Sequence, residues 1–358
     1  MADADFWGGR RTIIRRVLRG LSVAETVAFF HEIGVPMHEE EDGKLFPDSN
    51  RARDVLNALV GAARDAGVTI VTGARVQNVE KVGATSEHGF GVVTTDGDVA
   101  ADRVVLATGG RSLPKSGSDG AGFEIARRLG HSIVPTTPAL VPLLLDPTDT
   151  LHRELTGVAH DAELTLWIEG AVEIRVRGSL LWTHFGISGP VALNMSRHWL
   201  RSMLERRNAE LTLNFCPDRT FDDVEQWWIA RTRERPQSSL STALSALTPT
   251  SVAGALLSRL RLRPDITLAH LSREDRRVLS HALAKWPLRV TGDRGYNVAE
   301  ATAGGVPLDE IDPSTMRSRL CTGLSLVGEI LDVDGRIGGF NFQWAWSSAR
   351  VAAAAVGT

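Results

Sequence analysis

The sequence predicts an α/β fold: a discontinuous α/β domain, with a domain of mixed strands and helices inserted into it. Helical and strand patterns alternate before residue 136, and a proline-punctuated stretch, PTTPALVPLLLDPTD, then introduces short alternating strands. Strands with glycine-rich turns resume at PLRVTG, residues 287–292. We therefore expect one domain from residues 1–138 and 289–358, with residues 139–288 as the insertion.

Composition limits the classes of partner. The 358 residues include 43 acidic and 40 basic side chains, for a formal net charge of -3, and 43% are hydrophobic. A chain so close to neutral predicts no nucleic-acid partner and no membrane surface, and leaves a small-molecule substrate. The two cysteines, Cys216 and Cys321, lack metal-ligand spacing, which predicts no metal site and a reducing, cytoplasmic location. The oligomeric state is left open.

The opening segment predicts two helices followed by a strand. Ser22 and Glu25 have the spacing of a capping box, and the apolar positions after them predict a helix that ends at Gly34. Residues 50–66 repeat the helical period. Gly67 then introduces the β-branched run VTIV, which predicts a strand.

A meander and a glycine-rich helix follow. ARVQNVEKV, HGFGVVTT and DVAADRVVLATGG predict strands, with a turn at Asp96 and Gly97, and they lead into a buried strand from Val104 to Ala107. GSDGAGFEIARRLGH then predicts a helix with glycines at its entry.

The insertion predicts short strands and then helices. AELTLWIEG, AVEIRVRG, SLLWTH and LTLNF alternate apolar and polar residues, as half-buried strands do. Residues 220–286 have helical patterns broken by turns at prolines. We expect Trp227, Trp228 and Trp286 to pack in the core, because aromatic side chains bury large areas.

The C-terminal stretch GLSLVGEILDVDGRIGGFNFQWAW is the first candidate binding site. Its strand ends at Gly328, and Gly338 and Gly339 precede a helix. This order would place carboxylates and bare backbone N–H groups at the carboxyl end of a strand, where open α/β sheets bind ligands. Carboxylates such as Glu329 and Asp332 suit sugar or ribityl hydroxyls, and a helix N-terminus suits a phosphate. The alternative is an acidic turn before a capped C-terminal helix.

A second strand end favours a long ligand. The strand in VVLATGGRSLPKSGSDGAG ends at Thr108, Gly109 and Gly110, small residues that allow a flat cofactor to approach the backbone. The alternative is an ordinary glycine turn.

The third candidate is the loop in LLWTHFGISGPVALNMS. Thr183, His184 and Ser188 lie among glycines between a strand and a helix, and His184 could move a proton near neutral pH. The alternative is a structural histidine, and no Asp or Ser spacing here marks a hydrolase triad.

Together these motifs resemble a known family. FWGG, LSVAETVAFFHEIGVPMHEEEDGKLFPDSNRARDVLNAL, VVLATGGRSLPKSGSDGAGFEIARRLGH, LLWTHFGISGP, LRVTGDRGYNVAEATAGGVPLDEIDPSTMRSRL and GLSLVGEILDVDGRIGGFNFQWAWSSA look like segments of the bacterial flavoproteins of the aminoacetone oxidase or NAD(P)/FAD-dependent oxidoreductase family. The resemblance covers nearly the whole chain. It implies a Rossmann-like FAD-binding domain of the two-dinucleotide-binding type and an FAD-dependent oxidoreductase. A small organic substrate is also implied, with NAD(P)H as a candidate reductant.

The resemblance also implies roles for individual residues around FAD. Those beside the cofactor would be Thr108, Gly109 and Gly110, with main-chain contacts from Val76 to adenine. Those on the ribityl-pyrophosphate arm would be Gly328, Glu329 and Asp332. Those facing the isoalloxazine would be Gly338, Gly339, Asn341 and Gln343. The THxGxSGP loop would lie across the flavin face, with His184 as the catalytic residue.

One part of the family pattern is missing from this sequence. Family members open with an apolar strand, a GxGxxG turn and an acidic residue on the next strand, all before the segment that matches Phe6 to Gly9. This sequence shows no such fingerprint before Phe6. We therefore expect an N-terminally incomplete FAD-binding domain that holds FAD weakly. The alternative is a degenerate or truncated homologue that no longer binds flavin and acts as a binding or structural protein.

Overall fold

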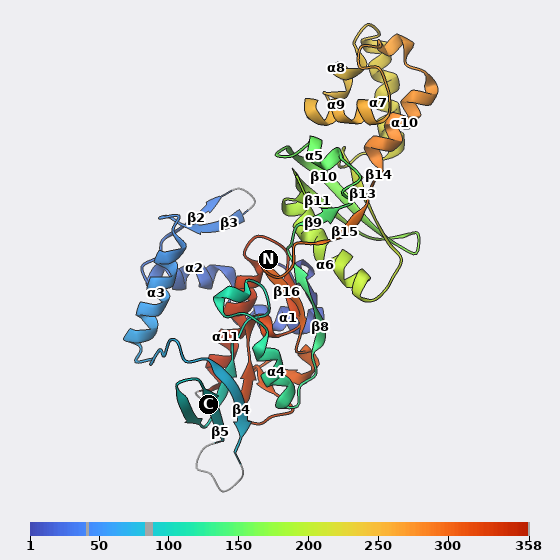
Figure 1. Cartoon of the computed structure of the whole chain (residues 1–358). Helices are drawn as coiled ribbons and strands as arrows, with labels where there is room; N and C mark the ends of the chain where they lie inside the picture. The colour runs from blue at the N-terminus through green and yellow to red at the C-terminus, as the bar shows by residue number, and fades with distance from the viewer. Residues whose placement is uncertain (41–42, 83–88, 357–358) are drawn as a thin grey trace. The chain divides into compact units, whose positions relative to one another are not determined.

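The structure is a computed structural model that describes residues 1–40, 43–82 and 89–356 (Figure 1). The chain divides into two compact units. Unit one comprises Met1–Thr136 and Ala301–Thr358, and unit two comprises Thr137–Glu300. The boundaries expected from the sequence were at residues 138 and 288, so the second boundary lies farther along the chain in the structure.

Unit one combines helices with short strands around one hydrophobic core. Its helices are α1 (Arg11–Leu18), α2 (Val23–Glu32), α3 (Ala52–Asp65), α4 (Ala121–Arg128) and α11 (Phe340–Val356). Its strands are β1 (Phe6–Gly8), β2 (Met37–Glu40), β3 (Lys44–Pro47), β4 (Val76–Lys81), β5 (Phe90–Thr94), β6 (Gly97–Ala101), β7 (Val104–Leu106), β8 (Val134–Ala139), β16 (Ala301–Gly305), β17 (Ile311–Asp312), β18 (Arg317–Ser318), β19 (Leu324–Leu326) and β20 (Val333–Gly335). Its single helical turns are η1 (Asp3–Asp5), η3 (Pro114–Ser116), η5 (Leu308–Glu310) and η6 (Gly328–Ile330).

The strands of unit one form several small sheets. β17, β18, β19 and β7 make a four-stranded sheet in which β7 and β19 run parallel, with Leu106 opposite Leu326. β4, β5 and β6 form the predicted antiparallel meander, β1 pairs with β20, and β2 pairs with β3. The first residue of the predicted strand HGFGVVTT, at position 88, lies outside the described residues. The parallel pair matters most for function, because it places the carboxyl ends of β7 and β19 side by side.

Local sequence signals account for the helices of unit one. Ser22 Oγ accepts the N–H of Glu25 at 3.2 Å, and the Glu25 carboxylate accepts the N–H of Ser22 at 2.7 Å, so the capping box of α2 is confirmed. Gly34 follows α2 with a φ of 84°, which glycine adopts without steric cost. The helices predicted at residues 50–66 and in GSDGAGFEIARRLGH are confirmed as α3 and α4.

Two strand predictions differ from the structure. The run VTIV does not form a strand, and Val68, Ile70 and Val71 are exposed. β7 forms as expected, but Val105 is 45% exposed, so this strand is not fully buried. β-Branched residues favour strands, yet a strand also needs a partner for its backbone N–H and C=O groups, and no described strand pairs with residues 68–71.

Unit two is built on an antiparallel sheet that closes on itself. Its strands pair in the order β14, β13, β10, β11, β12, β9 and β15, and every pair is antiparallel. The two end strands, β14 (Trp286–Leu288) and β15 (Val290–Asp293), are separated along the chain by Arg289 alone. Strands joined by one residue cannot lie at opposite edges of an open sheet, so the sheet must curl into a barrel. PLRVTG, which the sequence assigned to the returning segment, therefore contributes to this barrel.

Unit two also contains helices, most of them gathered beyond one end of the barrel, and its core is continuous (Figure 1). The other elements are β9 (Leu143–Leu145), α5 (Leu151–Glu154), β10 (Ala159–Ile168), β11 (Ala171–Thr183), β12 (Gly186–Ser188), α6 (Pro190–Leu204), β13 (Ala209–Asn214), α7 (Phe221–Glu234), α8 (Leu240–Leu244), α9 (Thr250–Arg259), η4 (Leu268–His270) and α10 (Arg273–Ala284). Trp228 is fully buried and Trp227 and Trp286 pack against the same core, so their predicted packing role is confirmed. Among the described residues, no helix has the length and apolarity needed to cross a membrane.

Candidate functional site

The two glycine-containing strand ends that the sequence singled out lie together in unit one. β7 ends at Leu106 and β19 at Leu326, as neighbours in register. The segments that leave them converge, because a Cβ built on Gly110 would lie 2.4 Å from Thr302 Oγ1 and 3.0 Å from Glu329 Oε1. A side chain at position 110 would therefore clash with Thr302, so glycine is what allows the two loops to meet this closely.

Glu329 holds this junction together. Its Oε1 accepts the backbone N–H of Thr302, and its carboxylate also accepts the N–H of Gly110. Burial raises the pKa of Glu329, while the hydrogen bonds from Thr302 and Gly110 oppose that rise and the nearby Asp334 carboxylate adds to it. The Glu329 carboxylate, which we expected to bind a ligand, therefore uses part of its hydrogen-bonding capacity within the protein.

Thr302 is a residue of this junction that the sequence did not reveal. It is fully buried, and its Oγ1 accepts the N–H of Arg111 at 2.8 Å and that of Ser112 at 3.2 Å. These bonds fix the chain directly after Gly110. From the sequence alone, a threonine in the short strand ATAGG would be taken for a packing residue. Its partner Arg111 lies 191 positions away, so no local pattern indicates the hydrogen bond between them.

A cavity of about 400 Å³ lies beside β7 and the start of α4. Its lining includes Val76 and Thr108, two of the residues implied by the resemblance, and glycines of the turn at 117–122. Arg75 pairs with Asp119 at 2.6 Å, and Asp119 Oδ1 accepts a backbone N–H at the start of α4. The Arg75 guanidinium lowers the pKa of the Asp119 carboxyl. The turn is therefore braced by an ion pair at the edge of the cavity.

Helix α4 approaches the end of β7 very closely. A Cβ built on Gly122 would lie 1.9 Å from Thr108 Oγ1, so no other residue fits there without a shift. Glycine at this position lets the main chain form the wall of the cavity, and main-chain N–H groups at a helix start suit an anion.

The start of α11 carries the predicted isoalloxazine contacts. Gly338 and Gly339 have φ values of 113° and 88°, a region that glycine adopts most readily. Asn341 Nδ2 donates to the carbonyl of Gly335, and Asn341 Oδ1 accepts the N–H of the same residue. Asn341 therefore shapes the loop that carries the glycine pair.

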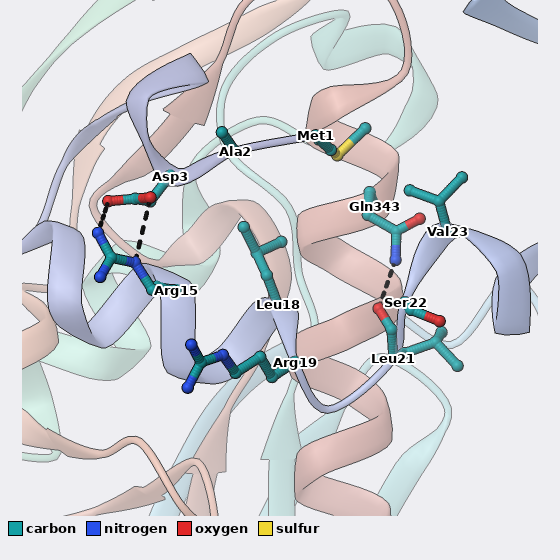
Figure 2. A pocket seen from close by; sticks show the side chains of 10 residues that line it. All are labelled: Met1, Ala2, Asp3, Arg15, Leu18, Arg19, Leu21, Ser22, Val23 and Gln343. Atoms are coloured by element: carbon teal, nitrogen blue, oxygen red, sulfur yellow. Dashed lines mark hydrogen bonds and ion pairs between the residues drawn. The ribbon is translucent and has the colours of Figure 1, made fainter.

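Gln343 is buried and bonded at both ends of its amide. Its Nε2 donates to the carbonyl of Leu21 at 2.8 Å, and its Oε1 accepts from Thr26 Oγ1 at 3.1 Å. Figure 2 shows this side chain beside a cavity of about 410 Å³, with the N-terminal residues and the segment between α1 and α2 around it. Gln343 thus ties α11 to that segment, and a contact with isoalloxazine stays a prediction.

The main chain of Gly328 and Asp332 also has partners within unit one. Gly328 donates its N–H to Ser348 Oγ at 2.9 Å, and its carbonyl accepts from Trp344 Nε1 at 3.1 Å. The carbonyl of Asp332 accepts the N–H of Gly9 at 2.8 Å. Gly328 is thus held against α11 and Asp332 against the residue that follows β1, and their contact with a ribityl-pyrophosphate arm stays a prediction.

His184 belongs to unit two. It lies in the tight turn between β11 and β12, where Thr183 Oγ1 accepts the N–H of Gly186 at 3.1 Å. His184 is exposed, and its ring packs edge-on against Phe185 with the ring centroids 5.1 Å apart. An exposed imidazole at the tip of a hairpin is accessible to a ligand and to water. Its catalytic role stays a prediction.

The thiols offer little reactivity. Cys216 and Cys321 are both unpaired and buried, and burial raises the pKa of Cys216 to about 11. Such thiols stay protonated and unreactive near neutral pH. In the part of the chain that the structure describes, no three His, Cys, Asp or Glu side chains are grouped closely enough to hold a metal ion.

The pattern over nearly the whole chain identifies the family. The HI0933-like protein Rossmann domain matches residues 4–355. The chain belongs to this family. The predicted fold class, an α/β fold of Rossmann type, is therefore confirmed.

Two relatives of this family member have names that describe an activity. A 3-dehydro-bile acid delta(4,6)-reductase from Clostridium scindens is 32% identical over 339 residues, which cover 94% of this chain and 81% of the relative. A ribosomal RNA dihydrouridine synthase from Escherichia coli is 34% identical over 317 residues, which cover 88% of this chain and 74% of the relative. Neither is named as an aminoacetone oxidase, and that narrower assignment stays a prediction.

A solved structure also aligns with the chain. It is the open conformation of a flavocytochrome c3 fumarate reductase, with a TM-score of 0.43 and 13% identity. The alignment covers 96% of this chain and 64% of that one, less than two thirds of its length. A likeness at this level adds nothing to the assignment.

Proposed function

We propose that the protein is an FAD-dependent oxidoreductase that reduces a carbon–carbon double bond conjugated with a carbonyl group. The main support for flavin binding is that two glycine-containing strand ends, Gly109-Gly110 and Gly328, meet beside a parallel strand pair. Membership of a Rossmann-domain family supports it. The reaction class is supported by the relatives' names, because a delta(4,6)-reductase and a dihydrouridine synthase both saturate a carbon–carbon double bond.

The residues present fit parts of an FAD molecule. The cavity beside Val76 and Thr108 has the volume of a small-molecule pocket and suits the adenosine end. The loop with Glu329 and Asp332 suits ribityl hydroxyls. The Glu329 carboxylate accepts hydrogen bonds from Thr302 and Gly110, and its remaining lone pairs can accept hydrogen bonds from the hydroxyls. The bare main chain before α11 suits the electron-rich edge of the isoalloxazine.

A bound flavin would supply the two-electron redox chemistry, and the chain supplies position, electrostatics and a proton. The N-terminal end of α11 carries a partial positive charge that favours negative charge nearby. His184 would give a proton to the substrate carbon next to the carbonyl, since an imidazole is the side chain best suited to proton transfer near neutral pH. NAD(P)H is the candidate source of electrons.

A second candidate is a homologue that binds no flavin and acts as a binding or structural protein. One observation favours it: Asn341 and Gln343, both implied as cofactor contacts, use their amides for bonds within the protein. A protein that had lost its cofactor could keep those bonds for stability alone.

Flavin retention and flavin reoxidation test the two candidates. Purified protein is incubated with FAD and desalted, and the flavin absorbance is compared with the protein concentration. Under anaerobic conditions the retained flavin is reduced with dithionite and mixed with 2-cyclohexen-1-one or with cyclohexanone, which lacks the double bond. We expect part of the flavin to be retained, as weak binding predicts, and the retained flavin to be reoxidised by the enone alone.

The His184→Ala variant separates binding from proton transfer in the same assay. It should keep its flavin and reoxidise about 100-fold more slowly, the usual scale for one acid–base group. No retained flavin in the unmodified protein would favour the second candidate, and equal reoxidation by both ketones would rule out the reaction class.

A further inference from the structure

The segment after β15 carries an arginine that contacts the His184 turn of unit two. Arg294 directly follows β15, and its guanidinium carbon Cζ lies 4.5 Å from the centroid of the Phe185 ring. His184 packs edge-on against the same ring, with the two ring centroids 5.1 Å apart. Both His184 and Arg294 are exposed. An imidazole and a permanently charged guanidinium therefore contact one aromatic ring, where a ligand can reach them.

Hydrogen bonds of the main chain hold both segments against β9. β9 pairs with β12 on one side and with β15 on the other. The carbonyl of Phe185 accepts the N–H of the last residue of β9 at 3.1 Å, and Arg294 donates its N–H to the carbonyl of Pro142 at 3.2 Å. Asp293 Oδ1 also accepts the N–H of Gly295 at 2.6 Å, which fixes the turn around the arginine. The backbones that carry the two side chains are thus held in place before any ligand binds.

The contact with the ring does not consume the hydrogen-bond donors of Arg294. A guanidinium over an aromatic ring is attracted by the electron-rich face of the ring, and its N–H groups still point outward in its own plane. The ring also restricts the long arginine side chain, so less conformational entropy is lost when a ligand binds. Arg294 can therefore present a planar set of positively charged donors to an oxygen atom.

Reduction of a double bond conjugated with a carbonyl needs such a group. A hydride, from the reduced flavin of the proposed function, adds to the carbon farther from the carbonyl, and the electron pair of the double bond moves onto the carbonyl oxygen. A proton then adds to the nearer carbon and restores the carbonyl, so the substrate gains two electrons and two protons in all. Negative charge develops on the oxygen in between, and a cationic donor placed there stabilises the transition state.

We propose that Arg294 is a second catalytic residue, whose N–H groups bind the carbonyl oxygen of the substrate while His184 gives a proton to the neighbouring carbon. The inference rests on the proposed function and assigns a role in it to a residue that no sequence motif singled out. The alternative is that Arg294 only packs on Phe185 and holds the turn in place. The two roles differ in their consequences, because packing supports stability whereas charge at the oxygen supports the rate.

Anaerobic reoxidation of retained flavin tests the chemical step. The flavin is reduced with dithionite and mixed with increasing concentrations of 2-cyclohexen-1-one. Arg294→Gln should lower the limiting rate by about 100- to 1,000-fold, the usual cost of losing one donor to a developing oxyanion. Arg294→Lys keeps the charge but not the planar set of donors, so it should recover only part of that rate. The matched control is Arg289→Gln, because Arg289 is exposed and precedes β15 at its opposite end, and it should react like the unmodified protein.

Binding of 4-nitrophenolate tests the same contact without turnover and without flavin. This anion is a flat ring with negative charge on its oxygen, so it resembles the enolate that the reaction forms. Equilibrium dialysis followed by the yellow phenolate absorbance should show Arg294→Gln binding about 10-fold or more weakly than the unmodified protein, because a charge-assisted hydrogen bond is lost. Arg289→Gln should bind normally. Neutral 4-nitroanisole has no charged oxygen, so its binding should be the same in all three proteins.

The outcomes separate this proposal from the proposed function. A limiting rate that Arg294→Gln leaves unchanged, a loss equal to that of Arg289→Gln, or phenolate binding that does not depend on Arg294 would each overturn it. Thermal melts of all variants check folding, and a lower melting temperature with a normal rate per retained flavin would assign Arg294 to packing alone. Reoxidation of the unmodified protein by the enone would still stand in those cases. If the unmodified protein retained no flavin, the phenolate measurement alone would decide.

Discussion

Unit two is a barrel closed by one bent segment, whereas unit one consists of small sheets with apolar residues at their surface. In unit two, β14 and β15 are adjacent in the sequence and are the first and last strands in the order of the sheet. In unit one, β7 is the last strand of its sheet, Val105 is 45% exposed, and Val68, Ile70 and Val71 are exposed as well. Each unit has a continuous hydrophobic core, and in unit one hydrogen bonds between separate segments, such as those to Thr302, add to it.

The largest effect that this comparison predicts is in the core of unit two. Trp228 is fully buried, and its Nε1 has no hydrogen-bond partner among the described residues. Trp228→Ala should lower the free energy of unfolding of unit two by about 3–5 kcal/mol, because it removes a large buried side chain and leaves a cavity. Trp228→Phe should cost much less, because it keeps most of the ring and removes an unsatisfied N–H. Chemical unfolding followed by circular dichroism measures both, and equal losses would contradict a core-dominated unit two.

The second effect concerns the hydrogen bonds of unit one. Thr302→Val keeps the size of the side chain but leaves the N–H groups of Arg111 and Ser112 without their acceptor. We expect the free energy of unfolding of unit one to fall by about 2–3 kcal/mol, since buried unpaired donors are costly. Thr302→Ser keeps the hydroxyl and should lose less than about 1 kcal/mol. A loss confined to Thr302→Ser, with Thr302→Val as stable as the unmodified protein, would show that methyl packing rather than hydrogen bonding is the main contribution of this side chain.

The third prediction compares a helical glycine in each unit. Gly122 of α4 has Thr108 Oγ1 only 1.9 Å from the position of a Cβ, whereas Gly254 of α9 has no atom within 4 Å. Gly122→Ala should destabilise unit one by about 1–3 kcal/mol through overpacking. Gly254→Ala should stabilise unit two by about 0.5–1 kcal/mol, because alanine favours a helix. Thermal melts of the two variants measure the difference, and changes of the same sign would show that the close approach of α4 can relax.

How far the sequence predicts these units depends on how local each signal is. The capping box at Ser22 and Glu25 was predictable because all of its partners lie within one helical turn. The glycine pair Gly109-Gly110 marked the end of β7 for the same reason. Closure of the barrel by residues 286–293 was not predictable, because strand partners far apart in sequence decide it.

The candidate site follows the same rule. Position along the chain indicated that Gly110 and Glu329 lie at strand ends, and the parallel pairing of β7 and β19 brings them together. The role of Thr302 depends on partners on two separate segments, and no local pattern marks it. For the run VTIV the local signal was misleading: its residues have strong strand propensity, but no described strand pairs with them.

The smallest predicted effect is the pH dependence of Glu329, because Glu329→Gln keeps both the volume and an acceptor oxygen. Burial raises the pKa of Glu329 above its usual 4.5, so the folded protein binds this proton more tightly than the unfolded chain does. Its stabilising contribution is therefore full below pH 4.5 and is lost as the pH rises through the raised value. Glu329→Gln stays neutral, so its stability relative to the unmodified protein should increase with pH. Glu25→Gln is the control of opposite sign, since hydrogen bonds from Ser22 lower the pKa of Glu25 and favour its charged form. Urea unfolding across the acid range measures the stability of each variant relative to the unmodified protein, and this difference should change with pH in opposite directions for the two variants. A difference for Glu329→Gln that does not change with pH would show that Thr302 and Gly110 fully compensate the ionised carboxylate.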